Sequence, residues 1–203
     1  ELMRNAAVVN VSASSNKVTE RVGGWRQYKL DPTQKEHINC TSTAVSYDFF
    51  ETMKATVLGG RTFSKEYPTD VYGGYILNES AVKFFGIADP VGKDLQGSAF
   101  NGSEWFTREG KIIGVVKDFH YASLHDKVQP VVFYLASEQT ELYRWLEVRI
   151  QSNNMRNTIA TLKTVWAKIA GDRPFEFEFM DEAVANHYQA EDRFLKIFTI
   201  FSV

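Results

Sequence analysis

The sequence predicts an α+β domain of split architecture, because two kinds of pattern follow one another along its 203 residues. Residues 1–60 and 143–182 alternate strand-like with helix-like stretches, whereas residues 61–142 consist of short strand-like runs, glycines and turns. Elements of different kinds bury their apolar faces in different layers, so this change predicts an α/β subdomain built from both chain ends and an inserted β-rich lobe.

The N-terminal region contains three strand-like runs, at residues 6–14, 24–30 and 37–45. A short helix is expected over residues 47–53, with Ser46 as its N-cap. The single cysteine, Cys40, excludes an internal disulfide and is expected as a small buried apolar side chain.

The middle region begins with a strand followed by a helix, within residues 73–86. Asn78 is the expected N-cap of that helix, and Gly86 is the residue expected to end it. Residues 103–116 predict a hairpin with its turn near Arg108–Gly110, and residues 131–135 predict a further strand.

The last third reads as strand, helix, strand and helix. The first strand is expected at residues 146–150, and the helix that begins at Ser152 ends at Gly171. That helix carries an apolar stripe made of Met155, Ile159, Leu162, Trp166 and Ile169. The run FEFEF (175–179) alternates strictly, which predicts a strand with its phenylalanines inward, and Asp181 is expected to cap the final helix.

The split architecture implies a specific strand pairing. We expect one sheet that contains the strands near 6–12, 37–45, 146–150 and 175–179. The β-rich lobe, residues 61–142, is expected to lie outside this sheet.

The final helix changes character at Arg193. Up to that residue it is amphipathic, but in RFLKIFTIFSV (193–203) apolar side chains surround the whole circumference. Such a helix enters either a core or a membrane, and the pattern favours a membrane. The run is about half as long as a membrane span, so we expect the chain to be an excised part of a longer protein.

Composition and motifs exclude several functions. The net charge of −2 provides no electrostatic footprint for nucleic acid. No glycine-rich phosphate loop and no G-x-S-x-G nucleophile motif occurs in the sequence. We therefore expect no catalytic residue, no bound cofactor and no metal ligand.

One constellation resembles a site. Asp118, His120, His125 and Asp126 are close enough in sequence to hold a metal ion if a loop gathers them. The two histidines have opposite parity for a strand and do not follow the i, i+4 spacing of a helix face. The alternative interpretation is a loop whose Asp118 and histidine side chains hydrogen-bond the backbone.

Four segments, taken in order, resemble the extracytoplasmic domain of MacB-like (FtsX-like) ABC transporter permeases, of the Bacteroidetes type. They are VSYDFFETMKATVLGGRTFSKE (45–66), YILNESAVKFFGIADPVGKDL (75–95), GKIIGVVKDFHYASLHDKVQPVVFY (110–134) and FEFEFMDEAVANHYQAEDRFLKIFTIFSV (175–203).

The resemblance implies a membrane-proximal α/β subdomain (residues 1–60 and 143–182), an inserted β-rich lobe (61–142) and a stalk helix (183–203) that leads into a transmembrane helix. It implies a non-catalytic domain on the periplasmic side of the inner membrane of a bacterium. The implied partners are a second permease copy or a pseudo-dimer partner, contacted through stalk and membrane helices, a cytoplasmic ATPase, and proteins of the periplasm or outer membrane.

Two other classes of function stay open at this stage. A metal-dependent hydrolase would use Asp118, His120 and His125. A membrane-tethered sensor domain would need a closed pocket of roughly 300 Å³ or more.

We expect the native protein to continue past Val203 as an uninterrupted helix into the bilayer, with another span before Glu1. Leaving side chains such as Phe194, Ile197 and Phe201 in water forfeits on the order of 2 kcal/mol each. The gene, expressed with its native flanks, is expected to yield protein in the membrane fraction. Recovery in the soluble fraction without detergent would contradict the expectation.

Overall fold

The computed structural model describes residues 2–18, 20, 24–30, 33, 35–100, 105–119, 128–136, 143–151 and 155–181. The helical elements are η1 (Leu2–Arg4), α1 (Phe49–Thr52), α2 (Asp70–Gly73), α3 (Glu79–Phe85) and α4 (Met155–Ala170). The strands are β1 (Val8–Ser14), β2 (Trp25–Lys29), β3 (Ile38–Val45), β4 (Val57–Gly60), β5 (Gly74–Asn78), β6 (Asp94–Phe100), β7 (Trp105–Val116), β8 (Val131–Leu135) and β9 (Trp145–Ile150). Helices and strands together confirm the α+β class. Within the described part of the chain, no helix is both long and apolar enough to span a bilayer.

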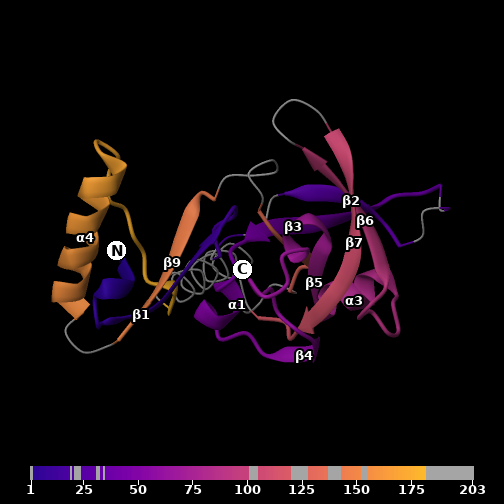
Figure 1. Cartoon of the computed structure of the whole chain (residues 1–203), viewed down its shortest axis with the longest axis horizontal. Helices are drawn as coiled ribbons and strands as arrows, with labels where there is room; N and C mark the ends of the chain where they lie inside the picture. The colour runs from indigo at the N-terminus through magenta and orange to yellow at the C-terminus, as the bar shows by residue number, and fades with distance from the viewer. Residues whose placement is uncertain are drawn as a thin grey trace, which may run out of the picture.

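Six of the strands close on themselves (Figure 1). Their order is β2-β6-β7-β5-β8-β3, and β2 also pairs with β3, which joins the two ends. The β5–β7 and β3–β8 pairs are parallel, and the other pairs of this strand ring are antiparallel. Closure leaves no free edge within the ring.

Both surfaces of the strand ring carry buried side chains. Successive residues of a strand point to opposite faces, so each strand contributes to both surfaces. Tyr75 and Leu77 of β5 belong to one apolar cluster, together with Cys40 and Leu95, and this cluster fills the inside. Ile76 belongs to a second cluster on the outside, which α1 covers with two aromatic side chains, Phe49 and Phe50. Thus β5 and β8 are buried along their whole length.

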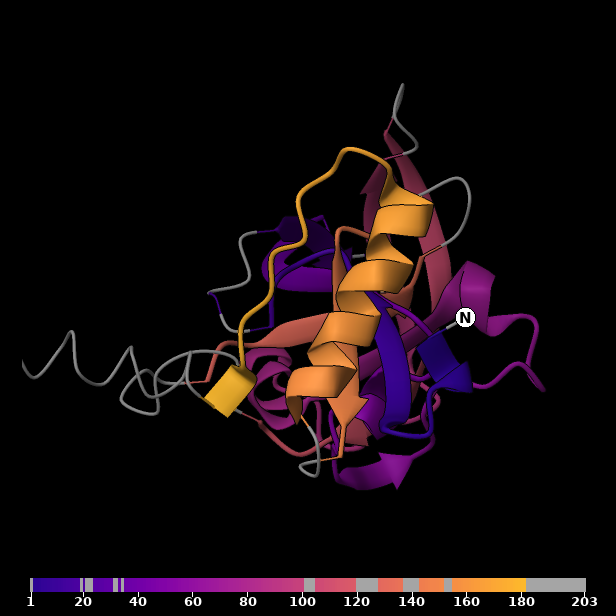
Figure 2. The same cartoon turned by 90° about the vertical axis from the view of Figure 1, so that its left-hand side faces the viewer.

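A two-stranded extension projects from the ring. β1 pairs with β9 along its whole length, but its only Cα register with β3 is Ser14 with Val45. Figures 1 and 2 show that α4 lies against one side of β1 and β9, whereas α1 lies on the other. We call β1, β9 and α4 the extension.

Several local predictions are confirmed. Asn78 is the N-cap of α3, where its Oδ1 accepts a hydrogen bond from Ala81 N at 2.9 Å. Gly86 ends that helix in the left-handed conformation, with φ of 67°, and Gly171 follows α4 with φ of 60°. Cys40 is fully buried.

The predicted hairpin at residues 103–116 is wrong. β7 is one continuous strand through Arg108–Gly110, and its hairpin partner is β6. Gly110 serves a close crossing instead of a turn, because a Cβ atom there would lie 1.8 Å from Gly73 O.

The predicted strand at 175–179 is also wrong, because these residues form no strand. Their phenylalanine rings contact one another in a row, with centroids 5.6 Å apart, and Phe177 is 54% exposed. At the start of the row, Phe175 contacts the Trp166 ring of α4. Alternation marks an apolar face, but it does not supply a strand edge to pair with.

Two smaller predictions need correction. Asp48 precedes α1 in place of Ser46, whose hydroxyl instead accepts a hydrogen bond from Ala13 N at 3.0 Å. In α4 the expected stripe is only partly covered, since Met155 is 39% and Ile169 70% exposed.

The strand at residues 37–45 pairs with other strands than those expected. β3 hydrogen-bonds to β2 and β8, so residues 37–45 share a sheet with part of the 61–142 segment. The outer apolar cluster likewise draws on both segments, through Phe50 and Phe133. The division into residues 1–60 with 143–182 and residues 61–142 stays a prediction, and the stalk at 183–203 lies outside the described residues.

We predict that Gly110→Ala lowers the free energy of unfolding by about 2–3 kcal/mol, because the added methyl group forces β7 away from Gly73. Urea unfolding measures the change. Gly59→Ala is the matched control, since its nearest contact would be Val91 Cγ2 at an ordinary 3.7 Å. Equal midpoints for the two variants would contradict the close crossing.

We also predict that Cys40 reports the opening of the ring. Burial raises the pKa of its thiol to about 12. Because the thiolate is the reactive form, alkylation at pH 8 should be about a thousandfold slower in the native chain than in urea. The chain has one cysteine, so the signal has one source. Labelling of the native chain at the unfolded rate would contradict a closed ring.

Candidate functional site

The structure places Asp118 at the beginning of α3. Its carboxylate accepts hydrogen bonds from Ser80 N at 3.0 Å and from Ser80 Oγ at 2.7 Å. In return, Asp118 N donates to Glu79 Oε2 at 3.0 Å. The carboxylate therefore satisfies one backbone N–H and one hydroxyl of the first helical turn, as expected for an anchored loop.

The other members of the metal hypothesis, His120, His125 and Asp126, lie outside the described residues. Within the described ranges, no three side chains of the types that ligate metals come together. The structure thus gives Asp118 a role in anchoring the chain.

An unexpected group of polar side chains occupies the inside of the strand ring. We call it the arginine–tyrosine cluster; its members are Arg26, Tyr28, Tyr75, Arg108 and Tyr134. Arg26 is 9% and Arg108 6% exposed. The ring of Tyr134 is close to both guanidinium groups, with its centroid 5.0 Å from Arg26 Cζ and 5.2 Å from Arg108 Cζ. Arginine over an aromatic face is a favourable arrangement, and burial strengthens it.

Arg108 binds the backbone carbonyls of α2. Its Nε donates to Tyr72 O at 3.0 Å, and its Nη2 donates to Val71 O at 3.0 Å and to Asp70 O at 3.2 Å. A cation at the carboxyl end of a helix satisfies carbonyls that have no intrahelical donor. Nη1 is buried and has no hydrogen-bond partner among the described residues.

The amino end of α2 is held separately. Arg61 forms a two-bond salt bridge with Asp70, at 2.6 and 2.8 Å. The same guanidinium stacks on Tyr67, with Cζ 3.7 Å from the ring centroid. Hence two arginines fix this four-residue helix on the ring.

The arginine–tyrosine cluster has little capacity for acid–base chemistry at neutral pH. Burial raises the pKa of Tyr75 to about 12 and that of Tyr28 well above its usual range, so both phenols keep their protons. Burial lowers the pKa of the Arg108 guanidinium, which nevertheless stays a cation because arginine is so strong a base. The contacts of the cluster hold the ring and α2 together.

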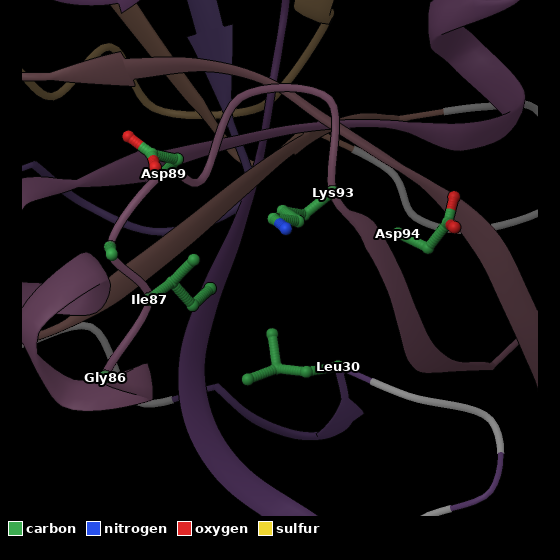
Figure 3. A pocket seen from close by; sticks show the side chains of 7 residues that line it. Leu30, Gly86, Ile87, Asp89, Lys93 and Asp94 are labelled. Atoms are coloured by element: carbon green, nitrogen blue, oxygen red, sulfur yellow. The ribbon is translucent and has the colours of Figure 1, made fainter.

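A surface pocket of about 320 Å³ lies where α3 leads into β6 (Figure 3). Leu30 and Ile87 form its apolar wall, and Lys93 points into the opening between Asp89 and Asp94. Asp94 is engaged by Lys111 at 2.6 Å. All three charged lining side chains are exposed, unlike the closed pocket that a sensor domain needs.

Sequence reasoning missed the arginine–tyrosine cluster. Arg108 falls in the predicted turn, and Arg26 lies in the strand-like run at residues 24–30 without a role of its own. The available signal was the inward parity that Arg26 shares with Tyr28 on β2. Recognising it required knowledge that this strand has a covered inner face.

Known structures resemble this architecture, although no protein family and no curated protein matches the sequence. The periplasmic region of MacB from Actinobacillus actinomycetemcomitans has a TM-score of 0.62 and 16% identity, over 89% of this chain and 76% of that one. The extracellular domain of the noncanonic ABC-type transporter YknZ from Gram-positive bacteria has a TM-score of 0.60 and 16% identity, over 85% and 81% of the two chains.

A third similar structure is a domain of a Porphyromonas gingivalis protein that is assigned as a permease. Its TM-score is 0.54 at 14% identity, over 84% of this chain and 78% of that one. Identities this low establish the fold and leave residue roles open. The chain therefore has the α+β fold of the extracytoplasmic domains of MacB and the ABC-type transporter YknZ, which confirms at the level of fold the MacB-like resemblance drawn from its sequence.

Proposed function

We propose that this chain is a non-catalytic extracytoplasmic domain of an ABC transporter permease. The observation that carries the proposal is the likeness to the MacB and YknZ domains over 89% and 85% of the chain. In this role the domain couples ATP hydrolysis in the cytoplasm to a conformational change outside the membrane, where it handles a partner or a substrate.

The proposal places the domain on the periplasmic side of the inner membrane. Its partners are a second permease copy or a pseudo-dimer partner, joined through stalk and membrane helices, and a cytoplasmic ATPase. Residues 183–203 are the proposed stalk that leads into the membrane.

The internal construction is suited to such coupling. The strand ring is closed and densely filled, whereas its link to the extension is narrow. That link comprises residues 13–16 and 44–46, which we call the joint. Its backbone hydrogen bonds are Ser15 N to Ala44 O at 2.9 Å and Ser46 N to Ala13 O at 2.8 Å. Described residues just before the proposed stalk also approach the chain next to the joint, since Glu178 pairs with Lys17 at 3.0 Å.

A second candidate is a membrane-tethered ligand-binding sensor. The place for its ligand would be the 320 Å³ surface pocket beside Lys93, which reaches the volume that a sensor needs but is open to solvent. On this reading a small molecule, rather than ATP turnover, changes the arrangement of the domain.

We predict that ATP changes the distance between the ring and the extension in the full-length permease with its ATPase. Spin labels at Glu109→Cys on β7 and Lys163→Cys on α4 report this distance, because both positions are exposed and Cys40 is shielded. A labelled pair at Glu109→Cys and Lys83→Cys, both on or against the ring, is the matched control and should not change.

The distance distribution of the first pair should shift between the ATP-free and ATP-bound states. Identical distributions throughout the ATP cycle would contradict coupling. A shift that requires an added small molecule and ignores ATP would favour the sensor.

A further inference from the structure

A half-buried carboxyl group lies in the strand pair that carries the joint. Glu147 of β9 lies directly opposite Ser12 of β1. It shares a face of its strand with Arg149, which contacts Thr52 O of α1, so this is the α1 side of the extension. Glu147 Oε2 is 3.0 Å from Ser12 Oγ, and Glu147 Oε1 is 2.5 Å from Ser14 Oγ. Ser12 and Ser14 are 3% and 1% exposed, so the serine side of these contacts is shielded from water, whereas Glu147 itself is half-buried.

The number of protons available for hydrogen bonds among Ser14, Asn16 and Glu147 indicates that the Glu147 carboxyl group is protonated. Ser14 Oγ is also 2.7 Å from Asn16 O, a carbonyl oxygen that can only accept. A hydroxyl has one proton, so Ser14 can donate to Asn16 O or to Glu147, but not fully to both. All the contacts are satisfied together when Ser14 donates to Asn16 O and Glu147 donates its own proton to Ser14 Oγ.

Nearby charges do not favour an ionised Glu147. On its own strand and face, Arg149 is turned to α1, where Nε donates to Thr52 O at 2.7 Å. Lys17 is engaged with Glu20 and Glu178, each at 3.0 Å. The titratable and charged groups on the surrounding elements are Arg4, Lys17, Tyr47, Asp48, Glu51, Tyr143, Arg144, Arg149 and Glu178, and none of them contacts the Glu147 carboxyl group among the described residues.

Burial acts in the same direction. It raises the pKa of Glu147, and the hydrogen bonds from Ser14 and Ser12 oppose it only in part. Removing a carboxylate from water favours the neutral acid unless a cation or several donors compensate.

Because Glu147 contacts a residue of the joint, the protonation state of its carboxyl group affects the joint. Ser14 is the residue of β1 whose Cα partner on β3 is Val45, so it belongs to the joint. When Glu147 ionises, the Ser14 hydroxyl must turn to the carboxylate. Asn16 O then loses its donor at the point where the chain leaves the extension for the ring.

We propose that Glu147 is a proton-binding site that sets the rigidity of the joint: the neutral acid locks Ser14 to Asn16, and ionisation releases that lock. The inference deepens the proposed function, since it adds regulation by extracytoplasmic pH to the coupling. The proton site itself is a property of the chain and stands or falls independently of transport.

Two measurements on the 203-residue chain test the site. In the first, the ¹³C resonance of the Glu147 carboxyl group is followed by NMR between pH 3 and 9, and we expect a midpoint above that of exposed glutamates. The protection factors of the Ser15 and Ser46 amides, which donate across the joint, should fall through the same pH range after correction for base-catalysed intrinsic exchange.

The second measurement is the pH dependence of unfolding in urea. A raised folded-state pKa stabilises the fold fully below the unfolded pKa of about 4.3, and this contribution is lost as pH rises through the folded pKa. Within that window the wild-type folding equilibrium constant should fall by about tenfold per pH unit relative to Glu147→Gln. The amide of Glu147→Gln imitates the neutral acid, because it donates to Ser14 and accepts from Ser12.

Glu66→Gln is the matched control, since it removes the same charge from an exposed position and should follow the wild type. An ordinary glutamate midpoint for Glu147 would overturn the proposal, and the NMR titration needs no variant to fold. Parallel pH profiles for the wild type and Glu147→Gln would overturn it as well. Absence of ATP-dependent motion in the permease would count against coupling while leaving a measured proton site intact.

Discussion

The pairing of β2 with β3 determines the character of the rest of the molecule, because it turns an open sheet into a ring. A small closed sheet must fill its interior with side chains. Here the filling combines aliphatic with aromatic side chains, and Tyr28 makes edge contacts with Tyr75 at 6.1 Å and Phe85 at 6.0 Å. Gly97 makes room for it: a Cβ atom there would lie 2.7 Å from the Tyr28 ring.

The same closure creates an electrostatic problem, which α2 helps to resolve. A buried guanidinium costs several kcal/mol in lost hydration unless its donors are satisfied. Arg108 meets this cost with carbonyls at the end of α2 and with the faces of Tyr75 and Tyr134, 4.9 and 5.2 Å from its Cζ. The helix in turn depends on Arg108, because four residues are too few to form a stable helix in isolation. A polar interior and a short helix thus stabilise one another.

Elements set by residues close together in the sequence could be predicted. Features that depend on contacts between residues far apart in the sequence could not. Asn78 and Gly86 could be assigned because capping depends on residues a few positions apart. Gly110 was misread, since its small size is required by Gly73, which lies far away in the sequence. Phe175–Phe179 shows the complementary error: its alternation was real, but the contact with Trp166 of α4 placed it outside any sheet. The arginine–tyrosine cluster could not be inferred without knowing that the strands close.

The ring and the extension differ in how they resist deformation. Moving a ring strand would break backbone ladders on two sides and disturb a packed interior, and packed interiors deform in discrete steps. The extension has one ladder, between β1 and β9, and a helix whose Ile169 remains 70% exposed. A force applied near residue 181 reaches the ring through the joint and through contacts with α1, such as that of Arg149 with Thr52 O. Displacement should therefore concentrate at the joint, and this is where a single proton, worth about one hydrogen bond, can shift the balance between a rigid and a yielding connection.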